Sequence, residues 1–155
     1  MPQKKILYRL MSSESDGEKE FFGIMGKFFA SMKIRRDFGY PIFDDDRMWI
    51  VAMIGEKVIG FGSFGVDKKG IGRLFDAWVD EKFRGQGIYK IITDYRMKWF
   101  IDHNISEVLV VAKPEMVSLY ERLGFKIEKM NGQYAYMKGQ PKVTGKDKVK
   151  KMRGR

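Results

Sequence analysis

The spacing of apolar residues along the chain predicts a mixture of helices and strands. Weak alternation over residues 5–10 predicts a first strand. A polar, acidic stretch follows, and within it Ser15-x-x-Glu18 has the pattern of a capping box at the start of a helix. Apolar side chains then recur at helical spacing over residues 21–32, and a second short helix is expected at residues 34–40, where glycine and proline end it.

Three apolar runs in the middle of the chain predict a strand meander. They cover residues 48–54, 58–66 and 71–79, and the turns between them, Gly-Glu-Lys and Asp-Lys-Lys-Gly, are short. Strands joined by turns of this length pair antiparallel. Three consecutive aspartates at 44–46 precede the meander. Their spacing does not fit a calcium-binding loop, so we expect a solvated acidic loop, with attraction of a cationic acceptor as the alternative.

The second half of the chain alternates between helical and strand patterns. Apolar positions at helical spacing predict an amphipathic helix over residues 88–103, and the run VLVVA at 108–112 predicts a buried strand. A helix that begins at Pro114 and ends before Gly124 comes next. An Asn-Gly turn within residues 125–138 predicts a final hairpin.

The order of these elements defines the expected fold class. It is β-α-α-β-β-β-α-β-α-β-β, an α/β fold with a mixed sheet. The strand–helix–strand unit at residues 74–112 is expected to be a right-handed parallel crossover. We expect a single domain over residues 1–138, because a chain of 155 residues with 44% apolar residues can bury a sizeable core.

Composition narrows the possible chemistry. The sequence contains no cysteine, which excludes disulfides, thiolate nucleophiles and cysteine metal sites. No signal peptide or membrane-spanning run is recognisable, and the N-terminal segment becomes polar by Ser12. We therefore expect a cytoplasmic protein with no membrane partner, and a homodimer is compatible with the sequence.

Positive charge is concentrated at the C-terminus. Of the formal net charge of +10, residues 138–155 carry +7, from eight basic residues and one aspartate. We expect residues 139–155 to form a disordered basic tail, because they contain few large apolar side chains. The tail is either simply solvated or attaches the protein to nucleic acid by charge. It lacks interleaved aromatic residues, so base stacking is not indicated.

A strand, a glycine-flanked basic loop and a helix follow one another at residues 74–92. The loop Arg84-Gly85-Gln86-Gly87 opens the helix, so its backbone N–H groups and the positive end of the helix dipole form a cradle suited to phosphate. Glycine lets the backbone approach an anion closely, and the arginine adds a permanent charge. Taken alone, this pattern fits an ordinary strand-to-helix turn equally well.

Two motifs resemble those of a known family. The pattern Arg84-x-x-Gly87-x-Tyr89 resembles the Arg/Gln-x-x-Gly-x-Gly/Ala signature of the GNAT superfamily of acyl-CoA-dependent N-acetyltransferases. Residues 113–125 are similar to the family motif Asn-x-x-Ala-x-x-Leu-Tyr-x-x-x-Gly-Phe, with Tyr120 in the tyrosine position and a lysine where asparagine is usual. The predicted element order is also that of the GNAT fold.

The resemblance implies acetyl-CoA as the co-substrate and no metal. The residues expected to bind it are Val79, Arg84, Gly85, Gln86, Gly87, Ile88, Tyr89 and Lys113. The loop amides and the arginine would hold the pyrophosphate. The pantetheine arm would lie along the strand that ends at Val79, where a backbone N–H is a candidate to stabilise the carbonyl oxyanion. Tyr89 departs from the family pattern, and its ring either points outward or narrows the site.

Two side chains are candidates for catalysis. By resemblance, Tyr120 is the general acid for the leaving thiolate, and reference pKa values of about 10 for tyrosine and about 8.5 for a thiol are compatible with that role. Asp76 lies within an otherwise apolar strand, where an unpartnered carboxylate is costly. We expect it to accept the amine proton through water or to orient a cationic amine. A salt bridge to Arg73 or to a lysine is the alternative.

The expected function is therefore transfer of an acetyl group from acetyl-CoA to a primary amine by direct attack. The acceptor amine belongs to a small molecule or a protein. Two alternatives remain: a GNAT-like enzyme that modifies or binds nucleic acid through residues 139–155, and a non-catalytic binding module built on this fold.

Overall fold

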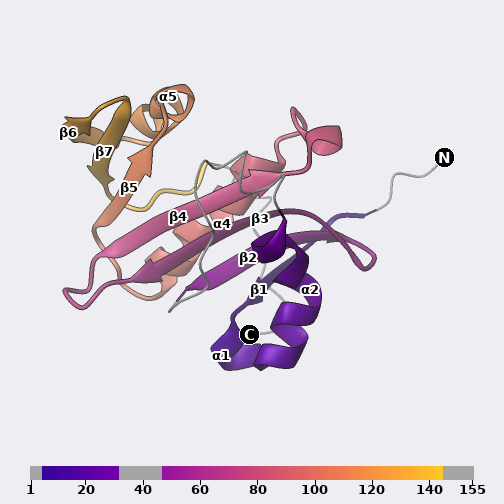
Figure 1. Ribbon diagram of the computed structural model, residues 1–155. Helices are drawn as coiled ribbons and strands as arrows, with labels where there is room; N and C mark the ends of the chain where they lie inside the picture. Colours follow the sequence, from indigo (N-terminus) through magenta and orange to yellow (C-terminus); the bar gives the residue numbers. More distant parts are fainter. Residues whose placement is uncertain (1–4, 32–46, 145–155) are drawn as a thin grey trace.

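A computed structural model of the chain describes residues 5–31 and 47–144, and Figure 1 shows how they are arranged. Seven strands form one sheet in the order β1-β2-β3-β4-β5-β7-β6. The strands are β1 (Leu7–Met11), β2 (Met48–Ile54), β3 (Lys57–Val66), β4 (Gly72–Val79), β5 (Val108–Ala112), β6 (Lys126–Asn131) and β7 (Tyr134–Gly139). The described helices are α1 (Ser13–Asp16), α2 (Glu18–Ala30), the 3-10 helix η1 (Glu81–Phe83), α4 (Ile88–Asp102) and α5 (Pro114–Arg122).

The sheet is mixed, as the element order predicts. Neighbouring strands pair antiparallel except β4 and β5, which pair in parallel. The parallel pair is the one that α4 connects, because a helical crossover returns the chain to the edge where the previous strand began. The α/β class with a mixed sheet is therefore confirmed (Figure 1).

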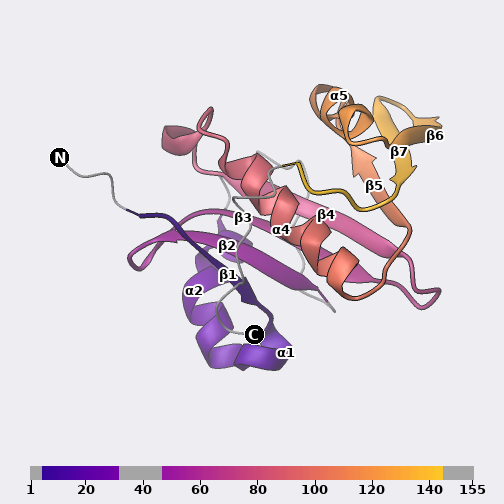
Figure 2. The same ribbon diagram turned by 180° about the vertical axis from the view of Figure 1, so that it is seen from behind.

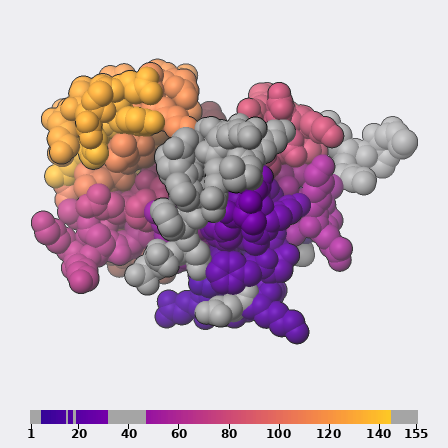
Figure 3. Space-filling model, in the orientation of Figure 1, coloured from indigo at the N-terminus to yellow at the C-terminus, as the bar shows by residue number. Residues whose placement is uncertain are grey.

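Helices cover both faces of the sheet, as Figures 1 and 2 show from opposite sides. On one face, α2 buries Phe21, Met25 and Phe28 in a cluster with Trp49 and Phe61 of the sheet. The three helix positions are four and three residues apart, so they lie on one side of α2, as the spacing predicts. In the space-filling view, α1 and α2 (indigo) lie apart from α5, β6 and β7 (orange to yellow), which group on another side of the molecule (Figure 3).

The opposite face of the sheet carries α4 and α5. Ile88, Ile92 and Phe100 of α4 are buried in a second cluster that also contains Tyr120 of α5 and Val110 of β5. Because the two helices share one core, α5 lies on the same face as α4 (Figure 2). No helix of the described part of the chain is long and apolar enough to cross a membrane.

The N-terminal helices begin differently from the prediction. The N-cap of α2 is Gly17, and no side chain caps the helix. The expected capping box at Ser15 is therefore wrong, because this residue belongs to a separate short helix, α1. Beside α1, the backbone N–H of Ser12 donates a hydrogen bond of 2.9 Å to the Asp16 carboxylate.

The start of the expected C-terminal tail has a defined position. Gly139 ends β7, and the following residues run beside α4 (Figure 2). Thr144 donates hydrogen bonds of 2.9 Å from its backbone N–H and its hydroxyl to the buried carboxylate of Asp94. The folded body therefore continues beyond residue 138. Three expected features lie outside the described residues: the helix at 34–40, the acidic loop at 44–46 and the tail beyond 144.

Candidate active site

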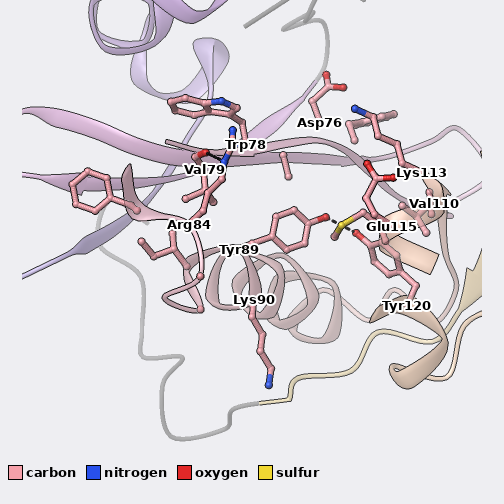
Figure 4. A pocket seen from close by; sticks show the side chains of 18 of the residues that line it. Asp76, Trp78, Val79, Arg84, Tyr89, Lys90, Val110, Lys113, Glu115 and Tyr120 are labelled. Carbon is pink, nitrogen blue, oxygen red and sulfur yellow. Dashed lines mark hydrogen bonds between the residues drawn. The ribbon is translucent and has the colours of Figure 1, made fainter. Parts of the chain in front are cut away.

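Strands β4 and β5 separate at one end of the sheet and leave a cavity between them. Their pairing is limited to residues 72–74 of β4 and 108–110 of β5, although β4 continues to Val79 and β5 to Ala112. A cavity of about 670 Å³ lies where the strands part. The loop after β4 and the first turns of α4 and α5 border it (Figure 4).

Most residues that the sequence motifs single out line this cavity. They are Asp76, Val79, Arg84, Gly85, Gly87, Ile88, Tyr89, Lys113 and Tyr120. Gln86 is exposed and is not part of the lining. Further lining residues that were not among the expected site residues include Trp78, Lys90, Val110, Glu115 and Met116. These lie on β4, α4, β5 and α5, so only the folded chain brings them together.

The loop between η1 and α4 presents backbone donors to the cavity. Gly85 and Gly87 have φ angles of 80° and 81°, which residues with a side chain rarely adopt. Gly87 is the N-cap of α4, and no side chain caps this helix. Because the first N–H groups of a helix have no intrahelical acceptor, this end offers donors where the helix dipole is positive. An anion such as phosphate suits this position.

Arg84 joins the loop to the end of β4. Its Nε donates a hydrogen bond of 2.8 Å to the backbone carbonyl of Val79. The side chain is exposed and belongs to the lining of the cavity, and Figure 4 labels it close to Val79. The bond keeps a permanent positive charge beside the helix N-terminus, which adds to the anion-binding character of the loop.

Tyr120 brings a buried hydroxyl to the cavity from α5. Its side chain is 2% exposed, and its hydroxyl lies 3.1 Å from the hydroxyl of Tyr89 on α4. Burial raises the pKa of Tyr120 well above its usual value, and Tyr89 adds to the rise, whereas the Arg96 guanidinium acts in the opposite direction. Tyr120 is therefore a protonated phenol at neutral pH.

Asp76 has an ion-pair partner that the sequence did not indicate. Its side chain is 6% exposed, and its Oδ2 lies 2.7 Å from Nη1 of Arg47. Arg73, the partner considered from sequence, instead pairs with Asp67 at 3.1 Å. Figure 4 shows the Asp76 carboxylate on the opposite side of β4 from the tyrosines. No local pattern marks Arg47, because it lies 29 residues from Asp76 in the chain.

A second cavity of about 480 Å³ adjoins the first. It is bordered by the Arg47–Asp76 pair and by residues of β4, β5, β6 and β7, including Glu128 and Tyr136. The two cavities share four lining residues, namely Phe75, Asp76, Val110 and Val111. They therefore meet at the point where β4 and β5 separate, one on the side of Tyr120 and the other on the side of the Asp76 carboxylate.

Arg96 is a buried cation close to the tyrosines that the motifs did not mark. It is 0% exposed, and its guanidinium donates to the Ser63 carbonyl at 3.1 Å and to the Thr93 hydroxyl at 2.9 Å. The sequence contains a signal for it. Position 96 follows Ile88 and Ile92 at intervals of four, so a charge lies on the apolar side of the helix.

Donors at a helix end and the free edge of an extended strand together suit a long ligand that carries phosphate. This geometry is typical of proteins that bind a phosphorylated carrier molecule. The sequence matches the family model described as the acetyltransferase (GNAT) family over residues 14–125. The chain belongs to this family, and its enzymatic class is acyl-CoA-dependent N-acyltransferase.

Solved structures with the same fold agree with the family match. PaiA N-acetyltransferase of Thermoplasma acidophilum, solved with coenzyme A, is 15% identical, with a TM-score of 0.60 over 88% of this chain and 99% of its own. Escherichia coli ElaA is 12% identical, with a TM-score of 0.70 over 88% and 100%. An aminoglycoside acetyltransferase solved with coenzyme A is 15% identical, with a TM-score of 0.60 over 88% and 95%. No curated protein sequence matches the chain.

Proposed function

We propose that the protein transfers an acetyl group from acetyl-CoA to a primary amine. The observation that carries this proposal is the cavity, which joins the N-terminus of α4, the part of β4 that β5 leaves unpaired and the buried hydroxyl of Tyr120. Two proteins of the same fold, an N-acetyltransferase and an aminoglycoside acetyltransferase, were solved with coenzyme A, which supports this ligand.

In this proposal, coenzyme A lies along β4. Its pyrophosphate accepts hydrogen bonds from the backbone N–H groups of residues 85–89, with the Arg84 guanidinium adjacent. Its pantetheine arm pairs as an added strand with the part of β4 beyond residue 74. Lys113, the N-cap of α5, borders the cavity on the side of β5 and contacts the same arm.

The amine approaches the thioester from the second cavity, which meets the first at Phe75 and Asp76. Its lone pair attacks the carbonyl carbon, and the backbone N–H near Val79 stabilises the oxyanion. Before the attack, Asp76, held by Arg47, orients the cationic amine or takes one proton from it through water.

Collapse of the adduct then breaks the C–S bond, and the proton for the leaving thiolate comes from Tyr120. The Tyr120 phenol is protonated at neutral pH, and the Arg96 guanidinium, which lowers its pKa against the effect of burial, favours release of this proton.

Titration calorimetry with coenzyme A tests the ligand. We expect Arg84→Ala to weaken binding about tenfold, or ~1.4 kcal/mol, because a cation beside the pyrophosphate is lost. Arg122→Ala is the matched control, since Arg122 is exposed on α5 outside the cavity lining. Unchanged affinity of Arg84→Ala would contradict the phosphate assignment. Absence of binding by the wild type at millimolar coenzyme A would favour the non-catalytic binding module.

A screen of primary amines with acetyl-CoA and a free-thiol readout tests the reaction. The panel would contain polyamines, aminoglycosides, free amino acids and lysine peptides. Release of thiol that depends on one of these amines is the expected result. If coenzyme A binds but no amine of any class accelerates thiol release, acetyl transfer to amines is refuted.

Nucleic acid is the second candidate partner, because residues 138–155 carry eight basic residues and one acidic residue. Deletion of residues 145–155 tests this contact while keeping Thr144 on Asp94. Salt-dependent binding of RNA or DNA that disappears on deletion would support it. If the full chain does not bind either nucleic acid at low salt, this candidate is excluded.

A further inference from the structure

The hydrogen bond between Tyr89 and Tyr120 places two phenols in series at the cavity. Tyr89 comes from the first turn of α4 and Tyr120 from α5, and their hydroxyl oxygens are 3.1 Å apart. Figure 4 shows the ring of Tyr89 extending across the cavity to the hydroxyl of Tyr120. Tyr89 is half-buried, whereas Tyr120 is 2% exposed. A ligand in the cavity therefore has readier access to Tyr89 than to Tyr120.

Arg96 interacts with the Tyr120 member of this pair. It is fully buried, and its hydrogen bonds to Ser63 and Thr93 go to neutral oxygens. Its Nε has no acceptor within the described residues. Burying a cation costs free energy unless a nearby group of opposite or partial negative charge interacts with it. Here the guanidinium lowers the pKa of Tyr120 against the effect of burial, which means that it stabilises the phenolate.

We propose, building on the acetyl transfer proposed above, that Tyr89 is a second catalytic residue and forms a proton relay with Tyr120. As the C–S bond breaks, its electron pair passes to sulfur, and sulfur takes the proton of the Tyr89 hydroxyl. Tyr89 takes the proton of Tyr120, which remains as a phenolate beside Arg96. The ammonium formed by attack of the amine loses one proton, and through water this proton restores Tyr120.

The relay explains why tyrosine stands where the family pattern has glycine or alanine. Without a side chain at position 89, a buried Tyr120 would have to contact the sulfur directly. The other charged side chains lining the cavity are Asp76, Arg84, Lys90, Lys113 and Glu115. These charged residues are unchanged in all variants below. A difference in thiol pKa or in kcat between variants is therefore due to the hydroxyl that was removed.

The first test uses the complex with coenzyme A and needs no acceptor. The ultraviolet absorbance of the thiolate is followed against pH for the wild type, Tyr89→Phe and, as control, Tyr95→Phe. Tyr95 is another tyrosine of α4, and its ring packs on Tyr8 with ring centroids 5.3 Å apart. A hydroxyl that donates to sulfur favours the thiolate, so Tyr89→Phe should raise the pKa of the bound thiol, and Tyr95→Phe should not.

The second test is kinetic and uses acetyl-CoA with the fastest amine of the screen. We expect Tyr89→Phe and Tyr120→Phe each to lower kcat about 100-fold with little change in the KM for acetyl-CoA. Because the two hydroxyls act in one relay, the double variant should be no slower than the slower single variant. Thermal unfolding of each variant serves as the control for folding.

The outcomes separate this inference from the function on which it rests. If Tyr89→Phe keeps the thiol pKa and kcat of the wild type while Tyr120→Phe is slow, the relay is refuted and acetyl transfer stands. Multiplicative losses in the double variant would also refute it, because they would mean independent roles. Failure of the wild type to bind coenzyme A would instead refute the proposed function.

Discussion

Gly62 shows how a single residue permits the arrangement beneath the site. It lies on β3 opposite Ala77 of β4. A Cβ at this position would lie 2.6 Å from Cγ2 of Ile92 and 3.2 Å from the guanidinium carbon of Arg96. Only glycine lets α4 approach β3 closely enough for Arg96 to reach the Ser63 carbonyl.

We therefore expect Gly62→Ala to destabilise the protein by about 1–3 kcal/mol, because the added methyl overpacks the core. The melting temperature should fall by roughly 2–4 °C for each kcal/mol. Gly23→Ala is the matched control, since a Cβ there meets nothing within 4 Å and α2 would gain about 0.5–1 kcal/mol. Calorimetric melting of both variants checks this, and equal melting temperatures would contradict the packing argument.

At the scale of elements, α4 connects three parts of the molecule. Its N-terminus opens the anion-binding loop, its buried side reaches Tyr120 through Arg96, and Asp94 holds the segment that follows β7. Periodicity predicted the helix and its apolar side. The Asp94–Thr144 contact was not predictable from a local pattern, because its two residues are 50 positions apart.

We expect Thr144→Val to release the segment after β7 from α4. The variant loses the hydrogen bond that the hydroxyl shares between the two oxygens of the buried carboxylate, at a cost of about 1–2 kcal/mol, and keeps the backbone bond. Hydrogen exchange of residues 139–144 should accelerate. Thr144→Ser retains the hydroxyl and should behave like the wild type. Exchange in Thr144→Val as slow as in the wild type would show that the hydroxyl does not hold this segment.

At the scale of the whole molecule, two tyrosines make folding sensitive to alkaline pH. Burial, together with Tyr95, raises the pKa of Tyr8 from 10.0 to about 12. Burial also raises the pKa of Tyr120 well above its usual value. Above about pH 10 the unfolded chain loses these protons while the folded chain keeps them. The contribution of these two tyrosines to the free energy of unfolding is therefore at its maximum below pH 10. It decreases as the pH rises toward their pKa values in the folded protein.

Urea unfolding between about pH 9 and pH 11.5 tests this dependence. The free energy of unfolding should fall more steeply with pH in the wild type than in Tyr8→Phe. The difference between the two slopes should approach the value for one proton released on unfolding. Tyr134→Phe is the control, since Tyr134 is a half-buried tyrosine at the start of β7. Identical slopes for the wild type and Tyr8→Phe would contradict a raised pKa.

The sequence by itself determined the features that depend on neighbours in the chain. Helical spacing placed the apolar sides of α2 and α4, and short turns placed the antiparallel strands. The glycines at 85 and 87 marked the loop because their positive φ angles are a local requirement. These features recur in any chain with the same pattern, since backbone geometry and side-chain period alone produce them.

Only the tertiary structure decided which side chains meet. Arg47 reached Asp76, Arg96 came to lie beneath Tyr120, and the ring of Tyr89 turned to that hydroxyl instead of pointing outward. Each contact joins segments that are far apart in the chain. Its existence depends on strand order, on the separation of β4 from β5 and on helix packing, and none of these is set by the residues adjacent in sequence.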